Sequence, residues 1–172
     1  MKSIVAAKEK IKPFQKAYPV ETVPIAKAVG LRVWRAKNWS NEVSGKIQKC
    51  EGKMAKFAGE SGYAIFANAD HSETRRRFTI AHEIGHFLLH KDSIGDGIYD
   101  DAMYRSGLQN WQEAQANAFA ADLLMPQHLL SEAMRDQYRS IAELAKLFNV
   151  SPQAMAIRMD KATAIRDGKV HD

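Results

Sequence analysis

The spacing of hydrophobic residues changes character along the chain. From Glu73 to His90 apolar residues occur on nearly every side of a helix, which predicts a helix buried on all faces. Short runs bounded by glycine-containing turns precede it. These runs predict the strands of a small antiparallel sheet, at Leu31–Arg35, Val43–Lys49, Lys53–Ala58 and Tyr63–Asn68.

Helical patterns lie on either side of this region. Ile4–Tyr18 is amphipathic and rich in lysine, and Glu21–Val29 ends at Gly30, a residue typical of helix C-termini. Seven of the sixteen residues from Trp111 to Pro126 are Ala or Leu, which predicts a further helix, and Pro126 ends it. We also expect a short strand within Ile98–Arg105 and a helix over Pro126–Arg135.

The C-terminal segment has the pattern of a helix-turn-helix. Asn149 ends its first predicted helix, and Ser151 and Pro152 have the residue types that begin the next. The expected architecture is therefore α+β, with a domain over residues 1–135 and a helix-turn-helix-like segment over 136–172 that packs on it. At 172 residues the chain is long enough to bury a substantial core.

The charge distribution argues against specific DNA binding by this segment. Residues 140–172 hold 5 basic and 4 acidic side chains, and the second helix offers Gln153, Arg158 and Lys161. Residues 1–60 are basic, with 13 Lys or Arg against 5 Asp or Glu, whereas 61–172 carry a net charge of −3. We expect a dispersed basic surface and only weak, salt-sensitive binding of nucleic acid.

Other sequence features bear on the compartment. No run of 18 apolar residues is present, and the N-terminus lacks the apolar core of a signal peptide. Cys50 is the single cysteine and cannot form an internal disulfide, which suits a reducing environment. We therefore expect a cytoplasmic protein without a membrane span. Between Lys49 and Glu51, Cys50 is expected to be an exposed thiol in a hairpin.

The chemistry is concentrated in the predicted buried helix. His82, Glu83 and His86 form an HExxH motif, in which the two histidines lie one turn apart on one face. Their imidazoles can reach one Zn²⁺, and Glu83 can take a proton from a metal-bound water as general base. Buried polar side chains need partners, and a metal ion satisfies all three of these residues.

A third protein ligand has to come from elsewhere in the chain. Asp92 is a weak alternative, and His90 lies too far along the helix from His82 to share one ion, so we expect it to face solvent or the last helix carbonyls. Glu113 lies in the predicted Ala-rich helix, one turn before Asn117. Glu113 could complete the coordination while Asn117 orients a ligating histidine.

Two sequence blocks resemble the ImmA/IrrE metallopeptidases over about residues 20–159. The first is RFTIAHEIGH and the second is ANAFAADLLMP, which follows Glu113. The resemblance implies a zincin-like fold, one zinc bound by His82, His86 and Glu113 in a gluzincin-like arrangement, and Glu83 as the general base. This chain has Gln115 where the family often has Glu. If the ligand stood at that position, zinc binding would be impaired.

The resemblance also implies a function, namely hydrolysis of a peptide bond in a helix-turn-helix repressor or a similar regulatory protein. Two alternatives stay open. The chain could be the toxin of a pair that a helix-turn-helix antitoxin neutralises, or a DNA-binding regulator. A further donor should stabilise the developing oxyanion, and Tyr104 is the first choice, with Tyr99, His71 and Arg105 as the other possibilities.

Overall fold

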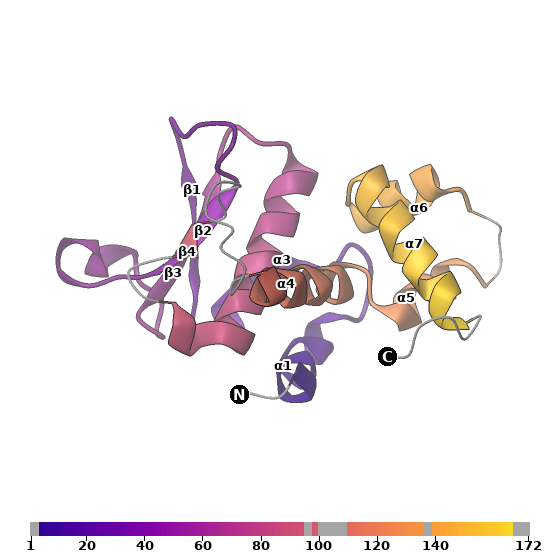
Figure 1. Cartoon of the computed structure of the whole chain (residues 1–172), viewed down its shortest axis with the longest axis horizontal. Helices are drawn as coiled ribbons and strands as arrows, with labels where there is room; N and C mark the ends of the chain where they lie inside the picture. Colours follow the sequence, from indigo (N-terminus) through magenta and orange to yellow (C-terminus); the bar gives the residue numbers. More distant parts are fainter. Residues whose placement is uncertain (1–3, 95–97, 100–109, 136–138, 167–172) are drawn as a thin grey trace.

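The computed structural model describes residues 4–94, 98–99, 110–135 and 139–166. A small sheet stands beside the long helix α3, and the C-terminal helices lie at the other end of the molecule (Figure 1). The helices are α1 (Ile4–Ile11), α2 (Thr22–Ala28), α3 (Glu73–His90), α4 (Asn110–Leu124), α5 (Gln127–Ala133), α6 (Ile141–Phe148) and α7 (Pro152–Arg166), with short 3₁₀ turns at Lys12–Phe14, Gly52–Phe57 and Lys91–Ser93. The α+β class expected from the sequence is confirmed.

The sheet has four strands in the order β1-β3-β2-β4: β1 (Arg32–Ala36), β2 (Gly45–Lys49), β3 (Tyr63–Asn68) and β4 (Ile98–Tyr99). β3 pairs antiparallel with β2 but parallel with β1, so the expected purely antiparallel sheet is wrong in this respect. All six residues of β3 are buried, as the nearly continuous apolar run of this strand requires for a central position. The rest of the strand expected within Ile98–Arg105 lies outside the described residues.

The strand predicted at Lys53–Ala58 is wrong, because this part of the chain is helical. Gly52–Phe57 forms a 3₁₀ helix, which places Met54 and Phe57, three residues apart, on one side. Both pack against the face of the sheet that points away from α3, together with Trp34 and Phe66. Cys50 belongs to the same small cluster and is 5% exposed, so the expected exposed thiol is wrong. Its side chain points into the cluster because the sheet pairing extends through this turn, where Cys50 N–H donates to the Gly62 carbonyl.

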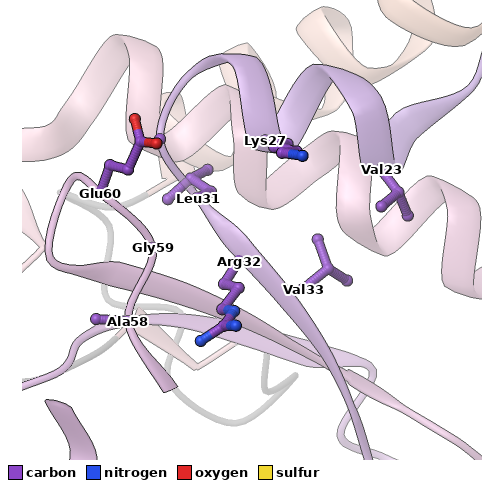
Figure 2. A pocket seen from close by; sticks show the side chains of 9 residues that line it. Val23, Lys27, Leu31, Arg32, Val33, Ala58, Gly59 and Glu60 are labelled. Carbon is purple, nitrogen blue, oxygen red and sulfur yellow. The ribbon is translucent and has the colours of Figure 1, made fainter. Parts of the chain in front are cut away.

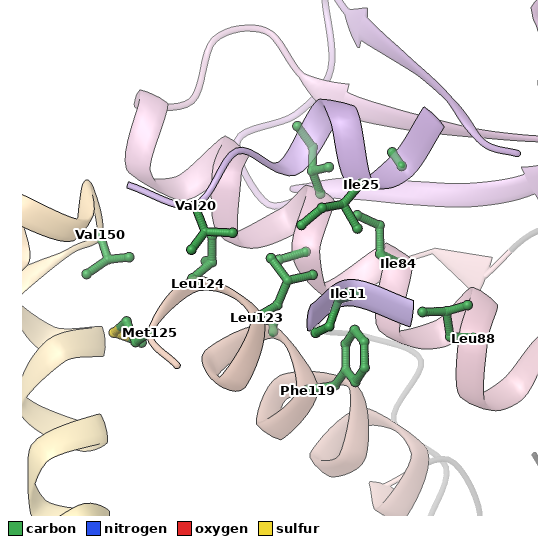
Figure 3. Packing of buried hydrophobic residues seen from close by; sticks show 14 of the residues in the cluster. Ile11, Val20, Ile25, Ile84, Leu88, Phe119, Leu123, Leu124, Met125 and Val150 are labelled. Carbon is green, nitrogen blue, oxygen red and sulfur yellow. The ribbon is translucent and has the colours of Figure 1, made fainter. Parts of the chain in front are cut away.

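The main core lies between the sheet and the helices. Figure 3 shows Ile25 of α2, Ile84 and Leu88 of α3, and Leu123 and Phe119 of α4 converging from three helices. Leu144, Phe148, Val150 and Met155 of the C-terminal segment belong to the same buried cluster. The C-terminal helices therefore share the hydrophobic core of the body.

Polar contacts also join α7 to the body. Arg158 donates to the Met125 carbonyl and forms an ion pair with Asp122, whose other carboxylate oxygen pairs with Lys8 of α1. The guanidinium of Arg77 in α3 is buried and donates to the Asn149 carbonyl at the turn between α6 and α7. Thus α1 and α7 both contact the C-terminal end of α4, and α3 contacts the turn between α6 and α7.

Candidate metal centre

The helix that carries the motif is well defined at its start and is almost completely buried. Ser72 caps α3 by accepting from the Arg75 N–H, and the helix runs from Glu73 to His90, the bounds expected from the sequence. His82 is 3% exposed and His86 is 1% exposed, and the Glu83 carboxylate is fully buried. Polar side chains at this depth are retained only where they have partners.

Close packing of α4 against α3 supplies the third acidic group. A Cβ atom on Gly85 would lie 3.3 Å from both the Cα and the carbonyl oxygen of Ala116, so the glycine lets the two helices approach closely. Ala116 and Ala120 are the buried small residues at this contact. Ala114, by contrast, is exposed.

The structure brings His82, His86 and Glu113 together, with all their ligand atoms within 4.8 Å of one another. The Nε2 atoms of the two histidines are 2.9 Å apart, and each lies 3.2 Å from one oxygen of the Glu113 carboxylate. Tetrahedral zinc with bonds of about 2.0–2.1 Å separates its ligand atoms by about 3.3–3.4 Å. The three side chains are thus spaced as ligands of one small cation.

The protonation of His82 supports the same conclusion. Its Nδ1 lies 3.0 Å from Asn117 Oδ1, an oxygen that can only accept, so Nδ1 carries the proton. The Nε2 atom then presents a lone pair toward His86 and the Glu113 carboxylate. A lone pair facing a carboxylate is repelled unless a proton or a cation lies between them. Two imidazoles and a carboxylate form a donor set that zinc takes in hydrolases.

The electrostatics of the group are those of an anion among imidazoles. Burial alone would raise the pKa of the Glu113 carboxyl. When protons on His82 and His86 stand where a metal ion would, their hydrogen bonds and charges outweigh burial and hold the pKa well below its ordinary value. Glu113 is therefore a carboxylate at neutral pH, the form that binds metal.

His90 is buried, contrary to the expectation that it faces solvent. It is 6% exposed, and its ring packs against the rings of His86, at 5.8 Å between centroids, and Trp111, at 5.1 Å. Burial, followed by the charge of His86, lowers the pKa of His90. His90 is buried because Trp111 of α4 packs over the C-terminal end of α3, a contact that the sequence near His90 does not indicate.

The remaining candidates for the site separate by position. Asp92 is exposed in a 3₁₀ turn and is not part of the cluster. His71 lies just before α3, and its Nε2 is hydrogen-bonded to the Asn41 carbonyl. At 1.5 Å per residue, the first residue of α3, Glu73, is about 13 Å along the helix from His82. Tyr104 and Arg105 lie outside the described residues, as does the side chain of Tyr99, so the oxyanion donor stays a prediction.

The chain matches a known protein family over most of its length. The family model described as IrrE N-terminal-like domain, Peptidase_M78, matches residues 27–160. The chain belongs to this family. It is 35% identical over 106 residues to the radiation response metalloprotease IrrE of Deinococcus radiodurans, and 33% identical over 107 residues to that of Deinococcus deserti.

These alignments cover different shares of the two partners. Each covers 59% of this chain, but only 32% and 37% of the respective relatives, so the chain spans about a third of the length of the curated proteins it matches. Membership of this peptidase family implies a bound metal. Among the described residues, no helix is both long and apolar enough to cross a membrane.

Proposed function

We propose that the chain is a zinc-dependent endopeptidase. The observation that carries the proposal is the cluster of His82, His86 and Glu113, in which Asn117 fixes the tautomer of one histidine. Zinc bound there would polarise the scissile carbonyl and lower the pKa of a water molecule toward about 7. The family match supports a metallopeptidase of this type.

The residues of the chain then have separate roles in the proposed reaction. His82, His86 and Glu113 hold the metal, and Asn117 keeps the His82 lone pair directed at it. Glu83, buried beside the first ligand in the chain, takes the proton from water and delivers it to the leaving amine. The buried setting strengthens each of these electrostatic interactions.

The proposed substrate is a helix-turn-helix repressor or a similar regulatory protein in the cytoplasm. The resemblance of the two motif blocks to the ImmA/IrrE metallopeptidases supports this proposal. The closest test is to express Glu83→Gln beside the unaltered protein in the source cell, to recover bound proteins, and to identify new N-termini by mass spectrometry. We expect a cleaved regulator only with the unaltered protein, and an intact one bound to Glu83→Gln.

The same experiment distinguishes the toxin alternative. General-base catalysis contributes roughly 10²–10⁴-fold, so Glu83→Gln should abolish cleavage while zinc and fold are retained. If a growth phenotype survives this substitution and no protein is cleaved, peptidase activity is not the function, and a non-enzymatic toxin is favoured instead.

Two observations support our proposal that the chain has no specific duplex-DNA partner. The first is the nearly neutral charge of residues 140–172. The second is that Arg158, one of the few basic residues on the second helix, is engaged by Asp122 and the Met125 carbonyl of the body. A salt titration with duplex DNA tests this. Nanomolar, sequence-selective binding lost on truncation near Arg139 would contradict it.

A further inference from the structure

The edge of the sheet away from β4 carries a groove. A cavity of about 480 Å³ lies along the first half of β1, between α2 and the loop at 58–60, and Figure 2 shows Val23 of α2 and Val33 of β1 facing each other across it. A second cavity, of about 270 Å³, shares Val23 and Val33 and continues along the strand past Arg35. We call the two together the β1 groove.

The backbone of β1 is open along this groove. In the described part of the chain β1 pairs only with β3, and the Ala36 carbonyl accepts from the Ala69 N–H at 2.7 Å on that side. Backbone N–H and C=O groups alternate in direction along a strand, so those of Arg32, Trp34 and Ala36 point toward β3. Val33 and Arg35 therefore present their N–H and C=O groups to the open edge.

The wall of the groove at its start is built into the fold. A Cβ atom on Gly59 would lie 2.2 Å from the Gly30 carbonyl oxygen, and Ser61 donates to that same oxygen through both its N–H and its hydroxyl. Gly30 itself has a φ of +83°, a conformation that other residues rarely adopt. This contact fixes the loop against β1, so the groove exists before any partner binds.

The charges along the groove favour an acidic partner. The lining of the two cavities holds five basic and three acidic side chains, which are Lys27, Arg32, Arg35, Arg76 and Arg77 against Glu21, Glu60 and Glu73. Of the basic ones, Lys27, Arg32 and Arg35 are exposed. Neither Lys27 nor Arg35 takes part in an ion pair with another described residue. A second copy of β1 added to this edge would bring the basic side chains of two chains together, and like charges on neighbouring strands are destabilising.

We propose that the β1 groove binds an extended, acidic segment of a partner protein by adding it to the sheet as a fifth strand. The outward groups of Val33 and Arg35 offer main-chain hydrogen bonds. Val33 and Arg35 lie two residues apart on the face of β1 toward α2, so side chains of the segment on that same face would meet both. Apolar ones would enter the cavity against Val23 and Val33, and acidic ones would meet Lys27 and Arg35. The inference does not depend on the proposed peptidase activity, because His82, Glu83, His86 and Glu113 line neither of the two cavities.

The test uses the full chain and two labelled synthetic hexapeptides with threonine at every odd position. The even positions are valine, glutamate and valine in the acidic peptide, and valine, lysine and valine in the basic one. Fluorescence anisotropy should show saturable binding of the acidic peptide, with the basic peptide at least tenfold weaker. Amide NMR shifts should locate the bound peptide at Val33 and Arg35. Equal binding of both peptides, or shifts confined to another surface, would overturn the proposal.

Variants separate the two sources of affinity. Reversing a surface charge that contributes up to about 1 kcal/mol should weaken binding roughly fivefold, so we expect this of Lys27→Glu and not of Lys10→Glu on α1. Val33→Pro removes an outward N–H, which an edge strand tolerates, together with one apolar side chain of the groove, and should weaken binding at least tenfold. If that variant does not fold, Arg35→Glu takes its place.

Zinc content and thermal unfolding report whether each variant is intact. Acidic-peptide binding that persists in folded Lys27→Glu and Val33→Pro would show that the groove is not the site. Analytical ultracentrifugation tests whether a second copy of the chain binds the β1 groove instead. A dimer of the unaltered chain that dissociates in Val33→Pro would show that it does, and would refute the acidic partner.

Discussion

Gly85 determines how close α4 comes to the motif helix, and replacing it with alanine tests that dependence. The added Cβ would meet Phe119 Cδ1 at 3.2 Å and the Ala116 Cα and carbonyl oxygen at 3.3 Å. The phenyl ring can rotate away, but the Ala116 contacts are with backbone. Relief therefore requires α4 to move by a few tenths of an ångström, and Glu113 lies on the same helix, one turn before Ala116.

The effects on stability and on metal binding should differ in size. Alanine gains about 1 kcal/mol of helix propensity over glycine, while overpacking costs about 1–3 kcal/mol, so the free energy of unfolding should fall by about 0–2 kcal/mol. Metal sites tolerate ligand displacements of about 0.2 Å. A shift of Glu113 by more than this should weaken zinc binding about tenfold, comparable to the loss of a residue that orients a ligand.

Competition with a chromogenic chelator measures zinc affinity, and urea unfolding of the metal-free protein measures stability. Gly52→Ala serves as the control, because nothing lies within 4 Å of its Cβ but its φ of +54° makes alanine strained. It should lower stability without changing zinc affinity. Gly85→Ala with unaltered zinc affinity would refute the idea that this helix contact positions Glu113.

Three further substitutions test other parts of the account. Asn117→Ala should lower zinc affinity about 10–100-fold in chelator competition, because the tautomer of His82 is no longer fixed; an unchanged value would rule out that role. Phe148→Ala should lower the free energy of unfolding by about 3–5 kcal/mol in urea, since its side chain is fully buried, and a loss below 1 kcal/mol would show that the C-terminal helices do not share the core. Asp122→Ala, which removes ion pairs to Lys8 and Arg158, should cost about 1 kcal/mol by the same measurement, and no change would show that these pairs do not fasten α1 and α7.

The sequence predicted the features that depend on local pattern. The bounds of α3 were predictable because Ser72 caps it and its apolar residues continue to the end of the helix. Helical periodicity carries this information within a few turns of chain. The spacing of Glu113 to Asn117 places both on one face of α4, but the choice of Glu113, which the structure brings to the histidines, came from the resemblance of the two sequence blocks to a known family.

Features that depend on distant segments were not predictable. The parallel pairing of β1 with β3 depends on how the chain crosses the sheet between residues 36 and 45, which strand composition does not encode. His90 was expected in solvent because the residue that covers it, Trp111, is 21 positions away. Lys53–Ala58 was expected as a strand, whereas the structure has a 3₁₀ helix at Gly52–Phe57, because so short a pattern of apolar residues fits either period.

The central claim is that His82, His86 and Glu113 together bind one zinc ion per chain. Metal analysis of purified Glu113→Ala beside Asp92→Ala and Gln115→Ala tests it most directly, because all three positions were considered for the third ligand and the structure groups only Glu113 with the histidines. We predict one equivalent of zinc in the unaltered chain and in Asp92→Ala and Gln115→Ala, and loss of tight binding in Glu113→Ala. Full zinc in Glu113→Ala, with loss in either of the other two, would contradict the account.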